Sequence, residues 1–209
     1  MTTIDTIPNE TPVAGNCYDR YHARNPLARH LMNQYMEVIR KVVLPLDTQR
    51  ILEIGCGEGH LTAFIHTVKP AAEIVGADLS ERIVGFARAA YPTLRFDVAN
   101  IYDMDYDAGS FDLVVASDVL QHLHDPQRAL REIVRVTKRW ALVTVPREPM
   151  WRMLNIMRLS YLDHLGNPPG HVQHFSRGDF LNILRGHFRL MRVDYPPPWI
   201  VALGRKGSV

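Results

Sequence analysis

Short apolar segments alternate with segments of helical periodicity along the middle of the chain. The apolar segments have the length and composition of buried strands, and the segments between them carry apolar residues at helical spacing. The runs typical of strands cover residues 50–55, 73–78, 94–98, 111–117 and 140–145. Strands that alternate with helices in this way predict an α/β fold with a parallel, doubly wound sheet and right-handed crossovers.

The pattern changes on both sides of this alternation. Residues 1–17 are polar and contain two prolines, which favours a mobile arm, and residues 18–45 predict a helical layer in front of the first strand. Residues 50–146 form the predicted core of the fold. Residues 147–175 are rich in Met and aromatic residues and predict either a lid over a ligand pocket or a helix packed into the core. Residues 176–209 predict a helix followed by two strands.

Those last two strands have a short connection that contains three prolines. They cover residues 188–195 and 199–205, and their closeness predicts an antiparallel hairpin at the edge of the sheet. The sequence therefore predicts one domain over residues 1–209, with a mostly parallel seven-stranded sheet and a C-terminal antiparallel hairpin.

Composition and charge exclude some classes of protein. The net charge of the 209 residues is +2, which argues against a dedicated nucleic-acid or membrane-surface protein, and the basic run 128–138 is interpreted as a solvated helix face. No apolar run is long enough to span a bilayer and no signal peptide is recognisable, so a cytoplasmic protein is expected. Cys17 and Cys56 form neither a disulfide framework nor a metal set.

Three glycines at alternate positions follow the first predicted strand. Gly55, Gly57 and Gly59 stand between this strand and the next helical segment, so they place backbone N–H groups and a helix N-terminus at the carboxyl edge of the sheet. Glycine tolerates a positive φ and lets a ligand approach the backbone. The alternative is an ordinary tight turn between a strand and a helix. The acidic residue at the end of the second strand favours a ligand-binding turn over this alternative.

That acidic residue is Asp78, about 20 residues beyond the glycine turn, where a carboxylate meets the two hydroxyls of a ribose. The pattern indicates an adenosine-type ligand with an unmodified ribose, hence a dinucleotide or S-adenosylmethionine. Dinucleotide turns prefer a glycine at the position of His60. Glu53 and Glu58 would also repel a pyrophosphate, whereas Glu53 suits an ammonium and a sulfonium group.

Several motifs together resemble the class I S-adenosylmethionine-dependent methyltransferases, especially the small bacterial enzymes that act on metabolites. The resemblance covers residues 52–145 and implies a Rossmann-like fold. The glycine turn resembles the family's first motif, and residues 111–123 resemble its fourth-strand motif, which closes the cofactor pocket and faces the acceptor. The cofactor-binding residues that the resemblance implies are Tyr18, Tyr21, Glu53, Gly55, Cys56, Gly57, Asp78, Leu79, Asp97, Val98, Ser117 and His122. Among these, Asp78 would bind the ribose, Leu79 would pack on the adenine, and Asp97 and Val98 would read the adenine edge.

The resemblance implies in-line transfer of a methyl group to oxygen, nitrogen or carbon of a small molecule. An oxygen acceptor needs a base, and His122, His171 and His174 are the candidate bases or orienting groups. The Met- and Trp-containing segment 150–162 predicts a hydrophobic or aromatic acceptor.

The residues leave open alternatives for metal binding, for the class of protein and for the oligomeric state. Asp118, Gln121 and His122 resemble a metal set of some quinone methyltransferases, but Gln121 replaces an expected Glu, so no metal is expected. A dinucleotide-dependent oxidoreductase and a non-catalytic cofactor-binding protein remain alternatives. The oligomeric state stays open.

Overall fold

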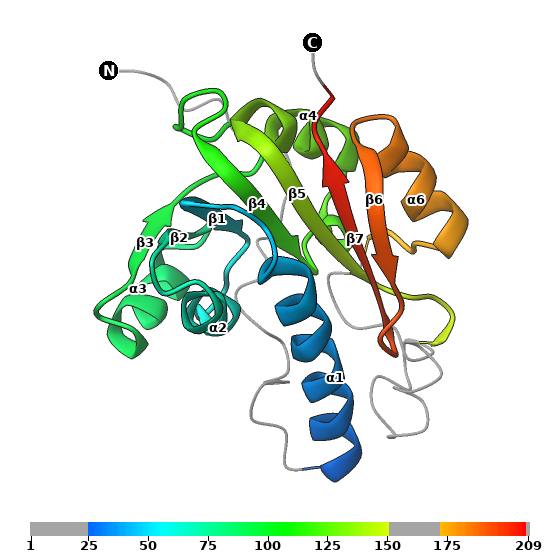
Figure 1. Cartoon of the computed structure of the whole chain (residues 1–209), viewed down its shortest axis with the longest axis horizontal. Helices are drawn as coiled ribbons and strands as arrows, with labels where there is room; N and C mark the ends of the chain where they lie inside the picture. Colours follow the sequence, from blue (N-terminus) through cyan, green and yellow to red (C-terminus); the bar gives the residue numbers. More distant parts are fainter. Residues whose placement is uncertain (1–24, 151–171, 208–209) are drawn as a thin grey trace.

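The sheet has seven strands in the order β3-β2-β1-β4-β5-β7-β6 (Figure 1). The computed structural model describes residues 25–150 and 172–207. The strands are β1 (Arg50–Ile54), β2 (Glu73–Asp78), β3 (Arg95–Val98), β4 (Phe111–Ser117), β5 (Thr137–Pro146), β6 (Arg189–Asp194) and β7 (Trp199–Arg205). The first five pair in parallel, and β7 runs antiparallel between β5 and β6. The predicted fold class is therefore confirmed.

Helices cover both faces of the sheet (Figure 1). They are α1 (Pro26–Val43), α2 (His60–Val68), α3 (Glu81–Ala90), α4 (Pro126–Val136) and α6 (Arg177–Arg185), with a short 3₁₀ turn η1 (Leu120–His122). Capping residues fix several starting points: the side chains of Asn25, Ser80 and Asp125 each accept a backbone N–H of the helix that follows. The predicted helix start at Asn25-Pro26 is confirmed.

Two large apolar clusters form most of the core, one on each face, and a smaller third cluster surrounds Phe96. Helices α1 and α2 pack against residues such as Leu113 and Val115 of β4, whereas α4 and α6 pack against Val114 and Ala116 of the same strand. Successive strand residues point to opposite faces. Because helices cover both faces of β4, both sets of side chains are buried, as its uninterrupted apolar sequence predicts.

Strand order reverses between β1 and β4, because the chain moves outward from β1 to β3 and then returns to the other side of β1. In open parallel sheets, ligands bind beyond the carboxyl ends of the strands at such a reversal. The carboxyl ends of β1 and β4 are Ile54 and Ser117, so the glycine turn and the residues after Ser117 lie side by side at this reversal, where Gly55 is close to Val119.

Strand β5 begins at Thr137, earlier than the expected start at residue 140. No loop separates it from α4, because the Thr137 hydroxyl donates to the Ile133 carbonyl at 2.6 Å and the chain turns directly into the strand. The predicted N-terminal arm and the greater part of the predicted lid lie outside the described residues, as do Tyr18, Tyr21 and His171.

The first testable prediction concerns Asp112, at the amino end of β4. Its Oδ2 accepts the backbone N–H groups of Gln49 and Arg50 at 2.9 and 3.0 Å. Burial acts to raise the pKa of Asp112, but these bonds and Lys138 outweigh it and lower that pKa. Asp112→Asn should lower the free energy of unfolding by about 1–2 kcal/mol at neutral pH, measured by urea unfolding.

This loss should shrink with acid. A carboxyl whose pKa is lower in the folded protein stabilises the fold above its unfolded pKa and loses this effect as the pH falls through the folded pKa. The wild type and Asp112→Asn should therefore converge at acidic pH. Lys138→Gln is the matched control, because this side chain is 67% exposed and its ion pair should contribute less than about 1 kcal/mol. An equal difference at both pH values would contradict the prediction.

Candidate functional site

The turn after β1 requires its glycines. Gly55, Gly57 and Gly59 have φ values of 76°, 54° and 82°, in the left-handed region that disfavours other residues. A Cβ atom on Gly55 would overlap with the Val119 side chain, and one on Gly59 would lie 2.7 Å from the Phe96 ring. The N–H groups of Gly55 and Cys56 donate to the Ala77 carbonyl at 2.7 and 3.0 Å, which fastens the turn to β2.

Asp78 lies directly across this turn, as its position at the end of β2 predicts. Its Oδ2 accepts the Gly57 N–H at 3.0 Å, and its Oδ1 accepts the Ser80 N–H at 3.0 Å. Each carboxylate oxygen has two acceptor positions, so both keep the capacity for a ligand hydroxyl while the turn holds the carboxylate in place.

The surroundings of the turn carry negative charge. Glu53 is 2% exposed and accepts a hydrogen bond from the Thr62 hydroxyl. Burial raises the pKa of the Cys56 thiol well above its usual range, and the nearby carboxylates of Glu53 and Asp78 raise it further. Cys56 is therefore a protonated thiol rather than a nucleophile. A turn surrounded by these carboxylates suits a cationic ligand and disfavours a pyrophosphate.

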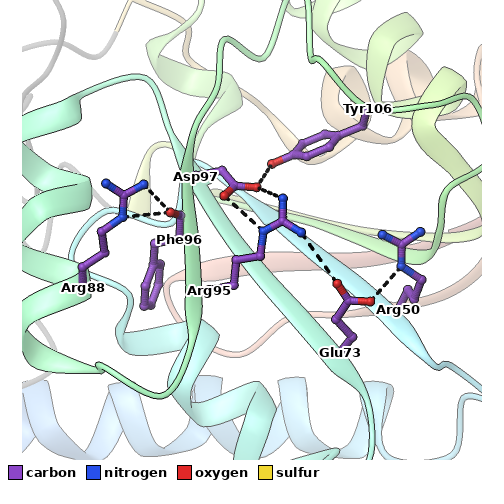
Figure 2. Close-up of polar contacts among 7 residues, drawn as sticks. All are labelled: Arg50, Glu73, Arg88, Arg95, Phe96, Asp97 and Tyr106. Carbon is purple, nitrogen blue, oxygen red and sulfur yellow. Dashed lines mark hydrogen bonds and ion pairs between the residues drawn. The ribbon is translucent and has the colours of Figure 1, made fainter.

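On the β3 side, the structure shows partners for Asp97 that the sequence did not indicate. The guanidinium of Arg95 donates to Oδ1 at 3.2 Å and to Oδ2 at 2.8 Å, and the Tyr106 hydroxyl donates to Oδ2 at 3.0 Å (Figure 2). Burial raises the pKa of Tyr106, and the Asp97 carboxylate adds to this, so the hydroxyl stays a donor. Arg95 also pairs with Glu73, which pairs with Arg50 (Figure 2). A role for Asp97 at the adenine remains a prediction.

The end of β3 nevertheless lies beside Asp78. Val98 pairs in register with Asp78, and Leu79 and Val98 are each 48% exposed, as befits side chains that could pack on a ligand. The Ala99 N–H donates to the Asp78 carbonyl at 3.0 Å, which brings the next residue, Asn100, to the same edge. The sequence analysis did not single out Asn100. Its position, as the first polar side chain after β3, corresponds to that of Asp78 at the end of β2.

Beyond β4 lies a buried polar network. The Tyr35 hydroxyl shares hydrogen bonds with the hydroxyls of Ser117 at 2.7 Å and Thr144 at 3.1 Å, and Thr144 donates to Asp118 Oδ1 at 3.4 Å. Trp199 Nε1 donates to Asp118 Oδ2 at 2.9 Å. The Ser117 hydroxyl therefore points toward α1, and any contact of this residue with a cofactor remains a prediction.

Asp118 has a positive φ of 56°, which is unusual for a residue other than glycine. It is 8% exposed, and its hydrogen bonds to Trp199 and Thr144 hold it in this conformation. Strained backbone that the surrounding structure maintains is concentrated at functional sites. The outlier lies at the carboxyl end of β4, where the sequence places the acceptor-facing motif.

Two of the three candidate histidines lie in the described residues. His122 ends η1 directly after β4, and its N–H donates to the Val119 carbonyl at 2.9 Å. His174 Nδ1 lies 3.8 Å from Glu148 Oε1, just beyond the end of β5. Both histidines are thus at the carboxyl edge of the sheet, and their chemical roles remain predictions. His171 lies outside the described residues.

The described residues contain neither a cluster of metal ligands nor a helix suited to cross a membrane. Within residues 25–150 and 172–207, no three His, Cys, Asp or Glu side chains are grouped so that they could hold a metal ion. No helix in these ranges has the length and apolarity needed to cross a membrane.

The architecture is that of a Rossmann-like, doubly wound α/β domain with a candidate ligand site at its strand reversal. Residues 52–144 match the family model described as a methyltransferase domain. Over these residues the chain is therefore similar to the class I S-adenosylmethionine-dependent methyltransferases, and the resemblance seen in its motifs is confirmed there.

Individual relatives agree with this classification. A probable S-adenosylmethionine-dependent methyltransferase of Mycobacterium tuberculosis is 34% identical over 110 residues, which are 52% of this chain and 39% of the relative. Trans-aconitate 2-methyltransferase of Escherichia coli is 30% identical over 116 residues, 56% of this chain and 45% of that protein. The chain thus spans less than half the length of these relatives.

A solved structure supports the fold. The crystal structure of an S-adenosylmethionine-dependent methyltransferase from Mesorhizobium loti superimposes with a TM-score of 0.63, at 20% identity, over 84% of this chain and all of that one. At this identity, the likeness concerns the fold alone.

Proposed function

We propose that the protein binds S-adenosylmethionine at the glycine turn and transfers its methyl group to a small molecule. The observation that carries the proposal is the joint geometry of the turn and Asp78: the Gly57 and Ser80 N–H groups hold the Asp78 carboxylate beside the turn and leave it acceptor capacity for a ribose diol. The carboxylates around Cys56 favour the cationic methionine part of this cofactor.

The bound cofactor would supply an electrophilic methyl group on a sulfonium. The chain's own contribution is then to hold the ribose with Asp78, to face the methionine part with the glycine turn, and to place the acceptor in line beyond β4. The buried network around Asp118 keeps that edge of the site rigid. Adenine would lie between Leu79 and Val98.

The proposed acceptor is a small hydrophobic or aromatic metabolite. The Met and Trp content of residues 150–162 supports this class, as does the net charge, which offers no basis for binding nucleic acid. A role in cytoplasmic biosynthesis is part of the same proposal. The Escherichia coli relative is named for trans-aconitate, a different kind of acceptor. Because it matches this chain over less than half of its own length, we do not assign that substrate to this chain.

A thermal-shift experiment tests the cofactor. S-adenosylhomocysteine at about 100 times its Kd should raise the Tm by roughly 5–10 °C, because ligand at that ratio adds about 2.7 kcal/mol of stability. NAD should leave the Tm unchanged, since Glu53 and Glu58 disfavour its pyrophosphate. A shift with NAD alone would support the oxidoreductase alternative. Cofactor binding without turnover of any small-molecule acceptor would support the non-catalytic one.

A further inference from the structure

A carboxylate and an imidazole lie together where the acceptor is expected. Glu148 follows the end of β5 by two residues, its side chain is 12% exposed, and both of its carboxylate oxygens are shielded from solvent. His174 Nδ1 lies 3.8 Å from its Oε1, and the His174 side chain is 44% exposed. The pair thus consists of a buried carboxylate and an imidazole that a ligand can reach.

The backbone around His174 is fastened to the ends of two central strands. The Val172 and Gln173 N–H groups donate to the Gln121 carbonyl at 2.9 and 3.0 Å, which ties the segment to η1 after β4. On the other side, the Glu148 N–H donates to the Phe175 carbonyl at 3.4 Å. His174 is therefore held between the carboxyl ends of β4 and β5, next to the crevice proposed for the cofactor.

The polar groups at this corner also indicate the chemistry of the ligand. Gln121 is 3% exposed, and its Nε2 donates to the Asp118 carbonyl at 2.8 Å, which fixes the orientation of the amide. Its Oε1 is buried and has no hydrogen-bond partner among the residues that the structure describes. A buried acceptor of this kind favours a donor from a ligand, and the carboxylates of Glu148 and Asp118 disfavour an anionic one.

We propose that Glu148 is a positioning residue that orients His174 to accept the hydroxyl proton of a neutral acceptor, such as a phenol. This inference rests on the proposed function. In the step, the acceptor oxygen forms a bond to the methyl carbon, the carbon–sulfur bond breaks with its electrons staying on sulfur, and the proton passes to the imidazole. Glu148 stabilises the imidazolium, and a carboxylate acceptor such as trans-aconitate would need no such base.

The test uses two phenols with the full-length protein and S-adenosylmethionine in mildly alkaline buffer. In that buffer 4-methylphenol keeps its proton and 4-nitrophenol has lost it; trans-aconitate is the anionic comparison. Glu148→Gln and His174→Asn are each expected to lower kcat for 4-methylphenol by about tenfold or more, with KM and S-adenosylhomocysteine affinity nearly unchanged. Turnover of 4-nitrophenol should not fall, because no proton remains to be removed.

A double variant separates positioning from folding. If Glu148 acts through His174, then Glu148→Gln combined with His174→Asn should be no slower than His174→Asn alone. His187→Asn is the matched control, since His187 contacts Gln127 away from this corner, and it should match the wild type. Thermal unfolding of each variant shows that it is folded.

Four results would overturn the inference while the proposed function stands. Two concern the variants: additive losses of kcat in the double variant, or equal losses of kcat for both phenols. Two concern the wild type: methyl transfer to trans-aconitate but to neither phenol, or cofactor binding with no methyl transfer to either phenol. If the wild type did not bind S-adenosylhomocysteine, the proposed function and this inference would fail together.

Discussion

Asp78→Ala is expected to weaken the binding of S-adenosylhomocysteine by at least about 100-fold, measured by isothermal titration calorimetry. The Asp78 carboxylate is fixed by the Gly57 and Ser80 N–H groups and keeps acceptor positions for the two ribose hydroxyls. Hydrogen bonds to a charged group contribute about 1.5–3 kcal/mol each, so the loss of two corresponds to roughly 100-fold or more in Kd.

Asp78→Asn is the informative comparison. Its side-chain oxygen still accepts one of the two backbone N–H groups, but the charge and one acceptor are lost, so an intermediate affinity is expected. Asp97→Asn should have a smaller effect than either, because Arg95 and Tyr106 already contact both of its oxygens. Binding by Asp78→Ala as tight as that of the wild type, with an unchanged Tm, would place the cofactor elsewhere.

The contrast between Asp78 and Asp97 shows what the sequence could predict. The position of Asp78 follows from local rules: a strand ends, glycines precede it at a known spacing, and parallel strands bring their carboxyl ends together. The neighbours of Asp97 follow no such rule. Tyr106 reaches it from the loop before β4, and Arg95 shares its face of the strand, so only the folded chain shows that the carboxylate is already engaged (Figure 2).

The buried network beyond β4 was even less predictable from the sequence than the neighbours of Asp97. Tyr35 and Thr144 are 109 residues apart, and Trp199 is 81 residues from Asp118. In the sequence, Tyr35 looks like an ordinary apolar position of α1, and Thr144 looks like a residue of a buried strand. Their hydroxyl contacts depend on how α1 and β7 pack against β5, which hydrophobic periodicity does not specify.

The doubly wound, mostly parallel sheet, in contrast, was accessible because each step is local. Strands that alternate with helices through right-handed crossovers leave few arrangements, and the short proline-rich connection between the last two strands favours their antiparallel pairing. The sequence predicted a hairpin at the sheet edge without specifying which of its two strands pairs with the rest of the sheet. In the structure, that strand is β7, which pairs with β5.

Gly55→Ala is expected to lower the free energy of unfolding by about 2–5 kcal/mol and to abolish detectable binding of S-adenosylhomocysteine. A left-handed φ costs an alanine roughly 1–2 kcal/mol, and overpacking adds about 1–3 kcal/mol. Both apply here, since φ is 76° and the new Cβ would overlap with the Val119 side chain. Urea unfolding measures the first effect and calorimetric titration the second.

The two costs can be separated with a second substitution. Val119→Ala removes the methyl groups that the new Cβ would meet, so Gly55→Ala in a Val119→Ala background should cost only the backbone share, about 1–2 kcal/mol. Gly85→Ala is the matched control: Gly85 lies within α3 with nothing near its would-be Cβ, and alanine there should stabilise the protein by about 0.5–1 kcal/mol. If Gly55→Ala cost no more than Gly85→Ala, the turn would not be the rigid, closely packed element on which the proposed cofactor site depends.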